Sequence, residues 1–580
     1  MISKEKVWLK YYSEEALALP FPTMSAYSYL KYSNRGRVNE VALHYYGKDI
    51  KFKQLFNDID EVANSFSALE VKKGDIVSFV SVAVPECIAS IYALNKIGAV
   101  ANTIDPRMDT ESIKRMVLES ESKILVVIDV AFPKIKAIMD DIHQKKIIVQ
   151  SPTRSLPCLK KVAMKAKLKF QVKLNVEYSE TVIDWDSFLK IGENTVAIEA
   201  PYKLDDVVAI TYTGGTTGFP KGVMLTNRSM NAAAFNFKRA GLAVTPGEKF
   251  LGIIPIFTSY GMVCGMHMPL CYRTVLVPIP RFVPTTFGKL VRQFRPNHMI
   301  STPAFYELMM NSKEVKKLDL SFLVTMGSGG DTMNEGLENK LVDFMVKHNI
   351  KYPLAQGYGM SEVSAAASFC VNDIYKRGSV GIPSVTTTIS IFDPDTQKEL
   401  DYNEIGEVCI TGPSMMKGYF KRPEETAHVM RKHDDGLTWV HSGDLGYIDK
   451  DGFLFIVGRV KRMITRFDGH KVFPVTIESF IAEHELVHSC SVIAVDDRER
   501  LQGQYPMAVI ELVAGVDASR EEEICREIYD RCQEHLEERG RPVAVVCVDE
   551  VPLTAMGKND YRALEKEFKY FDYIAWAKEA

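Results

Sequence analysis

A glycine- and threonine-rich loop directly after an apolar run is the feature that most constrains how this chain folds. Residues 211–222 read Thr-Tyr-Thr-Gly-Gly-Thr-Thr-Gly-Phe-Pro-Lys-Gly, and the run Val-Val-Ala-Ile precedes them. A strand that enters such a loop turns successive backbone N–H groups and hydroxyls toward one anion. The ammonium of Lys221 adds a point charge suited to phosphate. The sequence therefore predicts a phosphate-binding loop at the end of a strand.

A surface hairpin turn is the alternative for this segment, because Gly-Gly and Pro-Lys-Gly also occur in turns between strands. The four threonines favour the phosphate loop, since turns rarely need so many. A Walker loop is excluded, because Pro220 precedes Lys221 and no Gly-Lys-Ser/Thr tripeptide is present in the segment.

Length, charge and cysteine usage narrow the class of protein. The 580 residues exceed what one hydrophobic core supports, so we expect at least two domains. The net charge of −3 argues against nucleic acid as a partner. Ten cysteines without a Cys-x-x-Cys pair indicate reduced structural thiols in a cytoplasmic protein rather than a disulfide framework or zinc site. The chain starts without an apolar stretch, and Pro85 and Glu86 interrupt its most apolar window, so we expect neither a signal peptide nor a membrane span.

Short β-rich runs alternate with helical patterns along most of the chain. Residues 76–82 and 124–129 are predicted strands, and 86–97 and 110–120 are predicted helices. This alternation predicts an α/β fold with layered, mostly parallel sheets in a large N-terminal domain. The pattern changes near residue 460, and strands at 489–495 and 507–512 with a charged helix at 519–539 predict a small α+β domain. We therefore expect domains at 1–460 and 461–580.

Residues 145–173 carry nine Lys and Arg residues and no acid, with aliphatic residues interleaved. One helical face would hold Leu159, Val162, Ala163, Ala166 and Phe170, and another Lys161, Lys165 and Lys169. This pattern is compatible with a peripheral membrane contact. A solvated basic face is the alternative.

Three further motifs follow the loop. They are Gln-Gly-Tyr-Gly-Met-Ser-Glu at 356–362, Trp-Val-His-Ser-Gly-Asp-Leu-Gly at 439–446 with Gly458-Arg459 after it, and Leu-Thr-Ala-Met-Gly-Lys at 553–558. Together with the loop, they resemble the adenylate-forming (AMP-binding) superfamily, in the branch of acyl-CoA synthetases, 4-coumarate–CoA ligases and luciferases. The usual loop reads Tyr-Thr-Ser-Gly-Thr-Thr-Gly-x-Pro-Lys-Gly. Gly214 and Gly215 replace Ser-Gly here, and Ser361 and Ser442 replace threonines.

The resemblance implies a two-step reaction with ATP, Mg²⁺ and coenzyme A. Lys558, Thr217 and Glu362 are the implied catalytic residues, and Glu362 is the implied metal ligand. The implied phosphate contacts are Thr213, Gly214, Gly215, Thr216, Thr217, Gly218 and Lys221. The implied contacts to the rest of the nucleotide are Gly329, Gly330, Asp331, Gln356, Gly357, Tyr358, Gly359, Met360, Ser361, Asp444 and Arg459.

Some of these assignments have a structural alternative. Tyr358, which would stack on adenine, also suits an ordinary core position, and Glu362 also suits a helix N-terminus. The segment that holds Asp444 also suits a β-hairpin with Asp451-Gly452 as its turn, and this alternative is compatible with nucleotide binding by Asp444 and Arg459.

A mobile C-terminal domain is also implied by the resemblance. Lys461 is the implied hinge, and Arg462 occupies a position that is often acidic in the family. Lys558 would cross the gap between the domains and stabilise charge in the adenylation step. Gly469 resembles the glycine beside which the pantetheine arm passes, and its alternative is a hairpin glycine.

The acid substrate is only partly constrained. In Pro-Ile-Phe-Thr-Ser-Tyr-Gly at 255–261, Thr258 replaces the usual histidine, and no carboxylate is present to pair with an amino acid's ammonium. Small residues at 327–330 and 364–367 indicate a roomy apolar cleft for a fatty acid or an aryl acid. The hypothesis is an ATP-dependent acyl-CoA ligase for a hydrophobic carboxylic acid, preferably a fatty acid. Its alternatives are an enzyme that loads an acyl carrier protein and a non-catalytic lipid- or nucleotide-binding relative.

Overall fold

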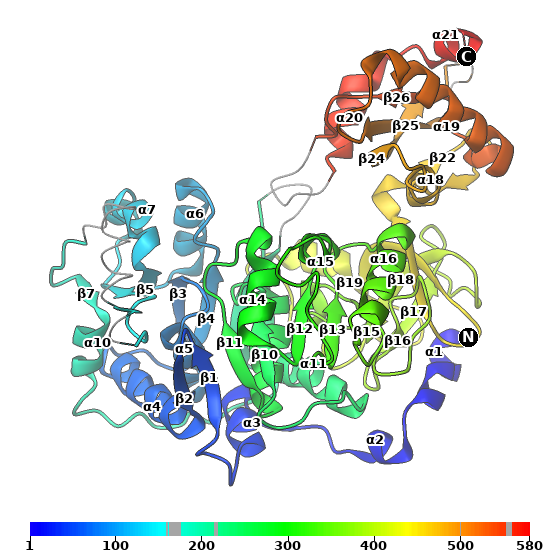
Figure 1. Cartoon of the computed structure of the whole chain (residues 1–580). Helices are drawn as coiled ribbons and strands as arrows, with labels where there is room; N and C mark the ends of the chain where they lie inside the picture. Colours follow the sequence, from blue (N-terminus) through cyan, green and yellow to red (C-terminus); the bar gives the residue numbers. More distant parts are fainter. Residues whose placement is uncertain are drawn as a thin grey trace.

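The computed structural model describes residues 1–157, 160–161, 176–213, 219–498, 500, 502–552 and 559–579. Three predicted features therefore lie largely or wholly outside the described residues: the phosphate loop, the helix expected in the basic segment, and Lys558. The described chain has a large α/β N-terminal part and a smaller C-terminal part that stands above it (Figure 1). The predicted fold class is confirmed.

The first sheet of the described chain has seven strands, built from Val- and Ile-rich runs. In spatial order they are β7 (Val182–Asp184), β6 (Lys146–Gln150), β5 (Ile124–Ile128), β3 (Ile76–Val80), β4 (Val100–Ile104), β8 (Val207–Thr213) and β9 (Lys221–Thr226). All neighbours are parallel except the hairpin pair β8–β9. Every residue of β4 and β5 is buried, as expected for a parallel sheet covered on both faces.

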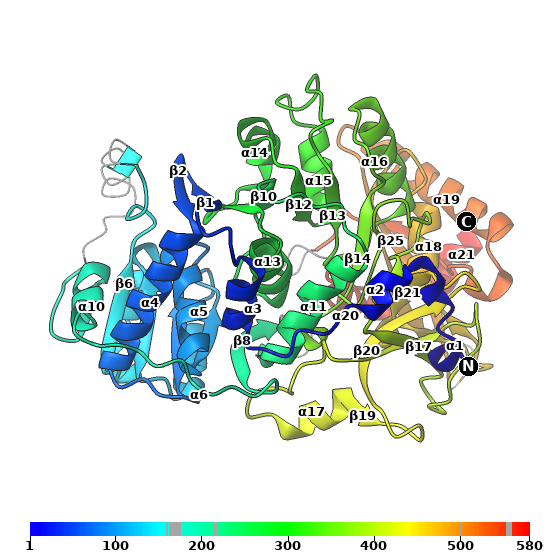
Figure 2. The ribbon, with the colours of Figure 1, turned by 90° about the horizontal axis from the view of Figure 1, so that it is seen from below.

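Helices α4 (Phe52–Ala68), α5 (Pro85–Ile97) and α6 (Thr110–Ser120) accompany this sheet (Figure 2). Helix α5 starts with Pro85 in its first turn and ends at Gly98, whose φ of 76° is a left-handed conformation that glycine adopts without strain. Asp109 caps α6 by accepting a hydrogen bond from the Ser112 backbone N–H. Both predicted helices are confirmed.

The second sheet has nine strands within the described ranges. Their spatial order is β16 (Ile382–Pro383), β15 (Ser368–Phe369), β14 (Ala355–Tyr358), β13 (Thr325–Ser328), β12 (His298–Ser301), β10 (Lys249–Gly252), β11 (Val275–Pro278), β1 (Val41–Tyr45) and β2 (Lys48–Lys51). The strands from β14 to β1 are parallel, and antiparallel strands extend both edges. Helices α14 (Phe287–Phe294), α15 (Pro303–Met310) and α16 (Glu335–Lys347) pack beside one another along it.

A third sheet is antiparallel, which the sequence pattern did not reveal. It contains β17 (Thr388–Phe392), β18 (Gly406–Thr411), β20 (Thr438–Ile448), β19 (Met430–Lys432) and β21 (Leu454–Arg459). Strands β20 and β21 form the predicted hairpin, with Asp451 and Gly452 in its turn. This sheet places Asp444 directly opposite Arg459.

The C-terminal part is an α+β unit, as predicted. Its elements are the hairpin β22 (Ile464–Thr465) and β23 (Lys471–Val472), the sheet β24 (Val487–Asp496), β25 (Gln504–Leu512) and β26 (Val545–Cys547), and helices α18 (Pro474–Ile481), α19 (Glu521–His535), α20 (Tyr561–Glu567) and α21 (Tyr573–Glu579). Helix α19 ends four residues before the predicted end. The two hydrophobic clusters of this unit draw their buried residues from Ile464 onward, and the larger clusters draw theirs from Leu454 and before. The cores therefore divide between Leu454 and Ile464, and the boundary at 460/461 stays a prediction.

Within the described residues, no helix combines the length and apolar character needed to cross a bilayer. Most described cations of the basic segment have partners elsewhere in the chain. Lys145 pairs with Glu70 at 2.7 Å, Arg154 pairs with Asp186 at 2.9 Å, and Lys160 donates to a backbone carbonyl. Acids from other segments therefore offset part of the charge that the sequence of residues 145–173 carries.

His267, at the end of a π-helical turn (Val263–His267), gives the N-terminal core a predictable pH dependence. The ring is fully buried, with Tyr92 Oη 3.0 Å from Nδ1 and Asn231 Oδ1 3.0 Å from Nε2. Burial lowers the pKa of His267 from 6.5 to about 3. As the pH falls, the unfolded chain protonates this histidine before the folded chain does. The neutral His267 ring therefore contributes fully to the free energy of unfolding above pH 6.5, and this contribution is lost as the pH falls toward 3.

We expect His267 to lower the free energy of unfolding by about 2 kcal/mol between pH 7 and pH 5. Urea denaturation of the wild type and His267→Gln at both pH values measures this effect. The variant, which carries no titrating ring, should lose less stability on acidification. Equal losses in the two proteins would show that His267 does not control this pH range.

Candidate functional site

The predicted phosphate loop joins two antiparallel strands. Thr213 ends β8 and pairs with Lys221 at the start of β9. Gly214, Gly215, Thr216, Thr217 and Gly218 lie outside the described residues. The segment is thus a hairpin in topology, as its alternative interpretation held, and its described ends place Thr213 and Lys221 side by side.

Glu362 lies at the centre of the described site. It belongs to a 3₁₀ turn (Ser361–Val363) that follows β14, and its side chain is buried. Its Oε1 accepts a hydrogen bond of 2.5 Å from the Tyr419 hydroxyl. Ser364 and Ala365 continue the loop with φ values of 54° and 88°, which are rare for residues that carry a Cβ. The tight loop turns Glu362 toward the segment that holds Tyr419.

Tyr419 also meets Lys221. The Lys221 ammonium lies 4.4 Å from the centroid of the Tyr419 ring, within the range of a cation–π interaction. One side chain therefore contacts both the predicted metal ligand and the predicted phosphate lysine. The sequence motif Lys417-Gly418-Tyr419 gave no sign of this role, because its partners lie 57 and 198 positions away in the chain.

Three predicted nucleotide residues converge at Asp444. The Tyr358 hydroxyl donates to Asp444 Oδ2 at 2.7 Å, and Arg459 Nε lies 2.7 Å from Asp444 Oδ1. Burial and the neighbouring Asp444 carboxylate raise the pKa of Tyr358 well above its usual 10, so its hydroxyl remains a donor. Both hydroxyls of a ribose would meet hydrogen-bonding groups at this point.

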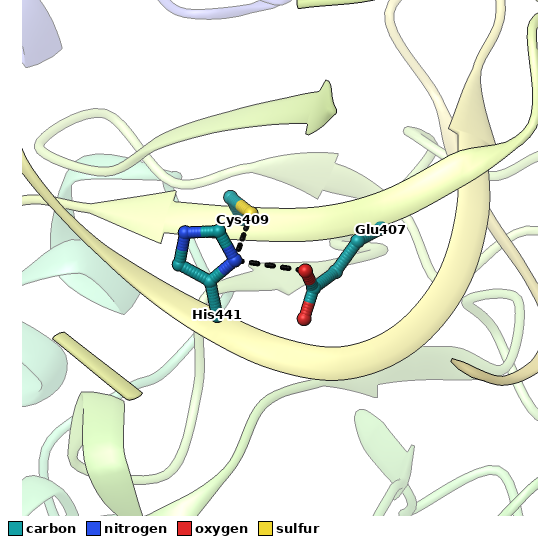
Figure 3. A group of neighbouring side chains, drawn as sticks. All are labelled: Glu407, Cys409 and His441. Carbon is teal, nitrogen blue, oxygen red and sulfur yellow. Dashed lines mark hydrogen bonds and ion pairs between the residues drawn. The ribbon is translucent and has the colours of Figure 1, made fainter. Parts of the chain in front are cut away.

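A buried pair fixes the strand bulge that carries Asp444. Figure 3 shows Glu407, Cys409 and His441 on the adjacent strands β18 and β20. His441 Nδ1 lies 2.8 Å from Glu407 Oε2, while Glu407 Oε1 accepts the backbone N–H of Gly443 at 3.0 Å. Burial raises the pKa of Glu407, but the bonds from His441 and Gly443 outweigh it and leave that pKa below its usual value. The ionised carboxylate therefore holds the backbone next to Asp444.

Glu407, Cys409 and His441 are also the one group in the described chain whose side chains could together bind a metal ion. Their ligand atoms lie within 4.8 Å of one another. Burial and the Glu407 charge raise the pKa of the Cys409 thiol well above 9, so this sulfur is protonated. The hydrogen bonds of Glu407 and His441 account for the cluster as a support of the Asp444 strand.

The hydroxyls of Thr258 and Ser259, which we expect near the acyl group of the substrate, form hydrogen bonds within the protein. Thr258 donates to the Pro255 carbonyl at 2.8 Å and accepts from the Gly261 N–H, and Ser259 bonds to Thr211 at 2.6 Å. Thr258 thus closes its own turn. The Tyr260 hydroxyl lies near Gly329, where an added Cβ would lie 3.5 Å from it and 3.1 Å from the Gly357 carbonyl oxygen.

The glycine-containing segments 327–331 and 356–361 begin on the neighbouring strands β13 and β14. Gln356 opposes Ser328 across β13 and β14, which places Gly329 beside Gly357. A Cβ at Gly359 would meet the backbone of Ala365, so this position requires glycine. Gly330 and Asp331 are exposed at the end of β13, whereas Met360 and Ser361 are half-buried. Ala366 and Ala367, expected in a pocket wall, are buried in the main core.

The predicted hinge is exposed, and the residue after it is anchored. Lys461 lies at the surface between β21 and β22. Arg462 forms an ion pair with Glu478, donates to the Val492 carbonyl at 3.1 Å and lies over the Tyr561 ring. The basic residue at this usually acidic position therefore belongs to the C-terminal unit.

Gly469 has the hairpin conformation that its alternative interpretation predicted. Its φ is 80°, and its N–H donates to the Arg466 carbonyl at 2.9 Å in the β22–β23 turn. An added Cβ would meet open space, so backbone conformation accounts for the glycine. Its predicted role beside pantetheine is not tested by this geometry.

Lys558 lies outside the described residues, but both ends of its loop are fixed. The Asp560 N–H donates to the Pro552 carbonyl at 2.7 Å. The Asn559 side chain donates to Ser489 Oγ and to the Cys490 carbonyl on β24. The segment that carries Lys558 is therefore attached to the central sheet of the C-terminal unit.

Comparisons with known proteins agree with this arrangement. The sequence profile described as AMP-binding enzyme matches residues 30–420, and the profile described as AMP-binding enzyme C-terminal domain matches residues 476–558. A long-chain-fatty-acid–CoA ligase of Bacillus subtilis is 28% identical over 98% of this chain and 99% of its own. A 4-coumarate–CoA ligase-like protein of rice is 29% identical over 90% and 88% of the two chains. The crystal structure of ATP-bound MatB from Rhodopseudomonas palustris has the same fold, with a TM-score of 0.77 at 22% identity over 94% of this chain and 99% of that one.

Proposed function

Because the chain belongs to the AMP-binding enzyme family and is an AMP-forming acid–CoA ligase, we propose that it activates a hydrophobic carboxylic acid, preferably a fatty acid. The acid becomes an acyl-adenylate, and the acyl group is then transferred to coenzyme A. The convergence of Tyr358 and Arg459 on Asp444 supports the adenylate-forming step of this proposal most directly. A carboxylate with two such partners, on a strand fixed from behind by Glu407, suits the paired hydroxyls of a ribose.

In the first step, the substrate carboxylate attacks the α-phosphorus of ATP and pyrophosphate leaves. Lys221 and the loop after Thr213 would hold the departing phosphates, and Lys558 would neutralise charge at the α-phosphate. Glu362 offers a buried carboxylate oxygen of the kind that Mg²⁺ prefers. When bound there, Mg²⁺ would supply positive charge to the phosphate oxygens.

In the second step, the thiol of coenzyme A attacks the acyl carbonyl and AMP leaves. Lys558 must withdraw before the thiol enters, which requires the C-terminal unit to rotate at Lys461. The proposal places the pantetheine arm beside Gly469. A hollow of about 340 Å³ lined by Arg466, Phe467 and Gln504 borders this glycine and offers room for such an arm.

The lining of the acyl side supports a hydrophobic acid. Thr258 and Ser259 form hydrogen bonds with Pro255 and Thr211, and neither side chain supplies a carboxylate to pair with an ammonium group. Phe257 and Tyr260 contribute aromatic surface to the same segment. The Bacillus subtilis relative is named for long-chain fatty acids, and the rice relative for an aryl acid. We therefore favour fatty acids and keep aryl acids as the alternative.

A thioester assay across a panel of acids tests this proposal. The panel should contain short, medium and long fatty acids, 4-coumarate and amino acids, with coenzyme A or acyl carrier protein as the acceptor. We expect acyl-CoA from fatty acids and no product from amino acids. Product with the carrier protein alone would replace coenzyme A as the acceptor, and a preference for 4-coumarate would replace the fatty acid.

We further propose that residues 145–173 bring the enzyme to anionic membranes from which poorly soluble acids are drawn. Each basic side chain near such a surface contributes about 1 kcal/mol, with screening over about 10 Å. Since Lys145 and Arg154 have acidic partners, the attraction falls mainly to Lys161, Lys165, Lys167 and Lys169.

Replacement of these four lysines by glutamate should abolish salt-sensitive binding to anionic liposomes in a sedimentation assay. Activity on a short, soluble acid should remain unchanged, because none of the four lysines belongs to a motif assigned to the site. Wild-type protein that stays in the supernatant with anionic liposomes at low salt would refute the membrane contact.

A further inference from the structure

We propose that Tyr419 is a positioning residue. It holds the metal-binding carboxylate of Glu362 and the phosphate-binding ammonium of Lys221 in a fixed relative position. This inference rests on the proposed function, because it assigns the side chain a task in the adenylation step. The resemblance to the family assigned roles to Glu362 and Lys221 and none to Tyr419.

The two contacts use different parts of one side chain. The hydroxyl donates to Glu362 Oε1 at 2.5 Å, whereas the ring centroid lies 4.4 Å from Lys221 Nζ. Tyr419 is only 4% exposed, so its packing fixes the ring. A charge-assisted hydrogen bond in a buried place is both short and strong. The carboxylate keeps Oε2 for a cation, and the ammonium is held without being neutralised.

The backbone around Tyr419 is tied to both partners. The Met416 N–H donates to the Glu362 carbonyl at 2.8 Å, and the Phe420 N–H donates to the Gly222 carbonyl at 2.7 Å, next to Lys221. The Lys417 N–H donates to the Met224 carbonyl on β9 at 3.0 Å. Residues 416–420 therefore form a bridge between the Glu362 loop and the strand that starts with Lys221.

The bridge gives the charged groups of Glu362 and Lys221 separate partners. A carboxylate and an ammonium placed near one another in a buried site attract strongly and can neutralise each other. Tyr419 offers each charge a partner that leaves it charged, namely a hydroxyl for Glu362 and a ring face for Lys221. Second-shell partners of metal-binding carboxylates typically change metal affinity or activity by about 10–100-fold when removed.

Two substitutions separate the two contacts. Tyr419→Phe keeps the ring face under Lys221 and removes the hydroxyl, whereas Tyr419→Leu removes both. Mn²⁺ can report cation binding by electron paramagnetic resonance in the presence of a non-hydrolysable ATP analogue. We expect Tyr419→Phe to weaken Mn²⁺ binding by about 10-fold or more while nucleotide affinity without the cation stays unchanged. Tyr419→Leu should weaken both.

Tyr45→Phe is the matched control, because Tyr45 is equally buried and its hydroxyl donates to the Pro152 carbonyl at 2.7 Å, remote from the site. It should bind Mn²⁺ like the wild type. In Tyr419→Phe, thioester formation from supplied acyl-AMP should fall less than adenylation does, since pyrophosphate has already left.

The outcomes are distinct. Mn²⁺ binding by Tyr419→Phe that equals that of the wild type would overturn the inference and leave the proposed function intact. Equal losses in Tyr419→Phe and Tyr45→Phe would also overturn it, since any buried tyrosine would then serve. A wild type that neither binds Mn²⁺ with the analogue nor releases pyrophosphate would overturn the proposed function together with the inference.

Discussion

Replacement of Lys558 by alanine should lower the rate of adenylate formation by about 10²–10³-fold, the usual effect of removing one preorganised charge donor from a transition state. Thioester formation from supplied acyl-AMP should proceed at the wild-type rate, because the role proposed for Lys558 belongs to the adenylation step alone. Asn559 and the Pro552–Asp560 bond hold the ends of the loop in the variant, so the fold should persist.

Single-turnover measurements of the two half-reactions test this expectation. Lys566→Ala is the control, since Lys566 is an exposed lysine on α20. It should leave both half-reactions unchanged. An equal loss in both half-reactions of the Lys558 variant would contradict the role assigned to this lysine.

Replacement of Glu362 by glutamine should raise the Mg²⁺ concentration needed for half-maximal adenylation by about 10–100-fold. The amide oxygen can still accept the hydrogen bond from Tyr419, so the shape of the site is retained and only the charge is lost. A magnesium titration of pyrophosphate release measures the shift.

Glu338→Gln is a closely matched control. Glu338 is a buried carboxylate that also accepts a tyrosine hydroxyl, from Tyr375 at 2.7 Å, and it lies on α16 outside the proposed site. The two variants should lose similar stability, but only Glu362→Gln should need more Mg²⁺. Wild-type rates of the Glu362 variant at limiting Mg²⁺ would show that another group binds the metal.

Local sequence patterns predicted much of the parallel part of the fold. Residues 76–80 and 124–128 form strands because continuous Val and Ile runs suit a sheet that is buried on both faces. Helix α6 has the predicted bounds, since Asp109 caps its start. The third sheet was not predicted because its strands belong to segments read as motifs, and because a bulge at residues 442–444 interrupts the regular alternation of β20.

The sequence motifs predicted part of the candidate site. They did not reveal side chains whose role depends on contacts between distant segments. Asp444, Tyr358 and Arg459 come together as the resemblance implied. Tyr419 and Glu407 were missed, because their partners are fixed by strand pairing between distant segments. A tyrosine after Lys-Gly or a glutamate after Gly carries no signal by itself.

The exchange of labelled pyrophosphate into ATP, with acid present and coenzyme A absent, tests the central claim most directly. An enzyme that forms an acyl-adenylate reversibly should incorporate label only when a suitable acid is added, and fatty acids should support the fastest exchange. Exchange that is independent of acid, or that requires coenzyme A, would contradict the account, because the acyl-adenylate would then not be the intermediate formed at this site.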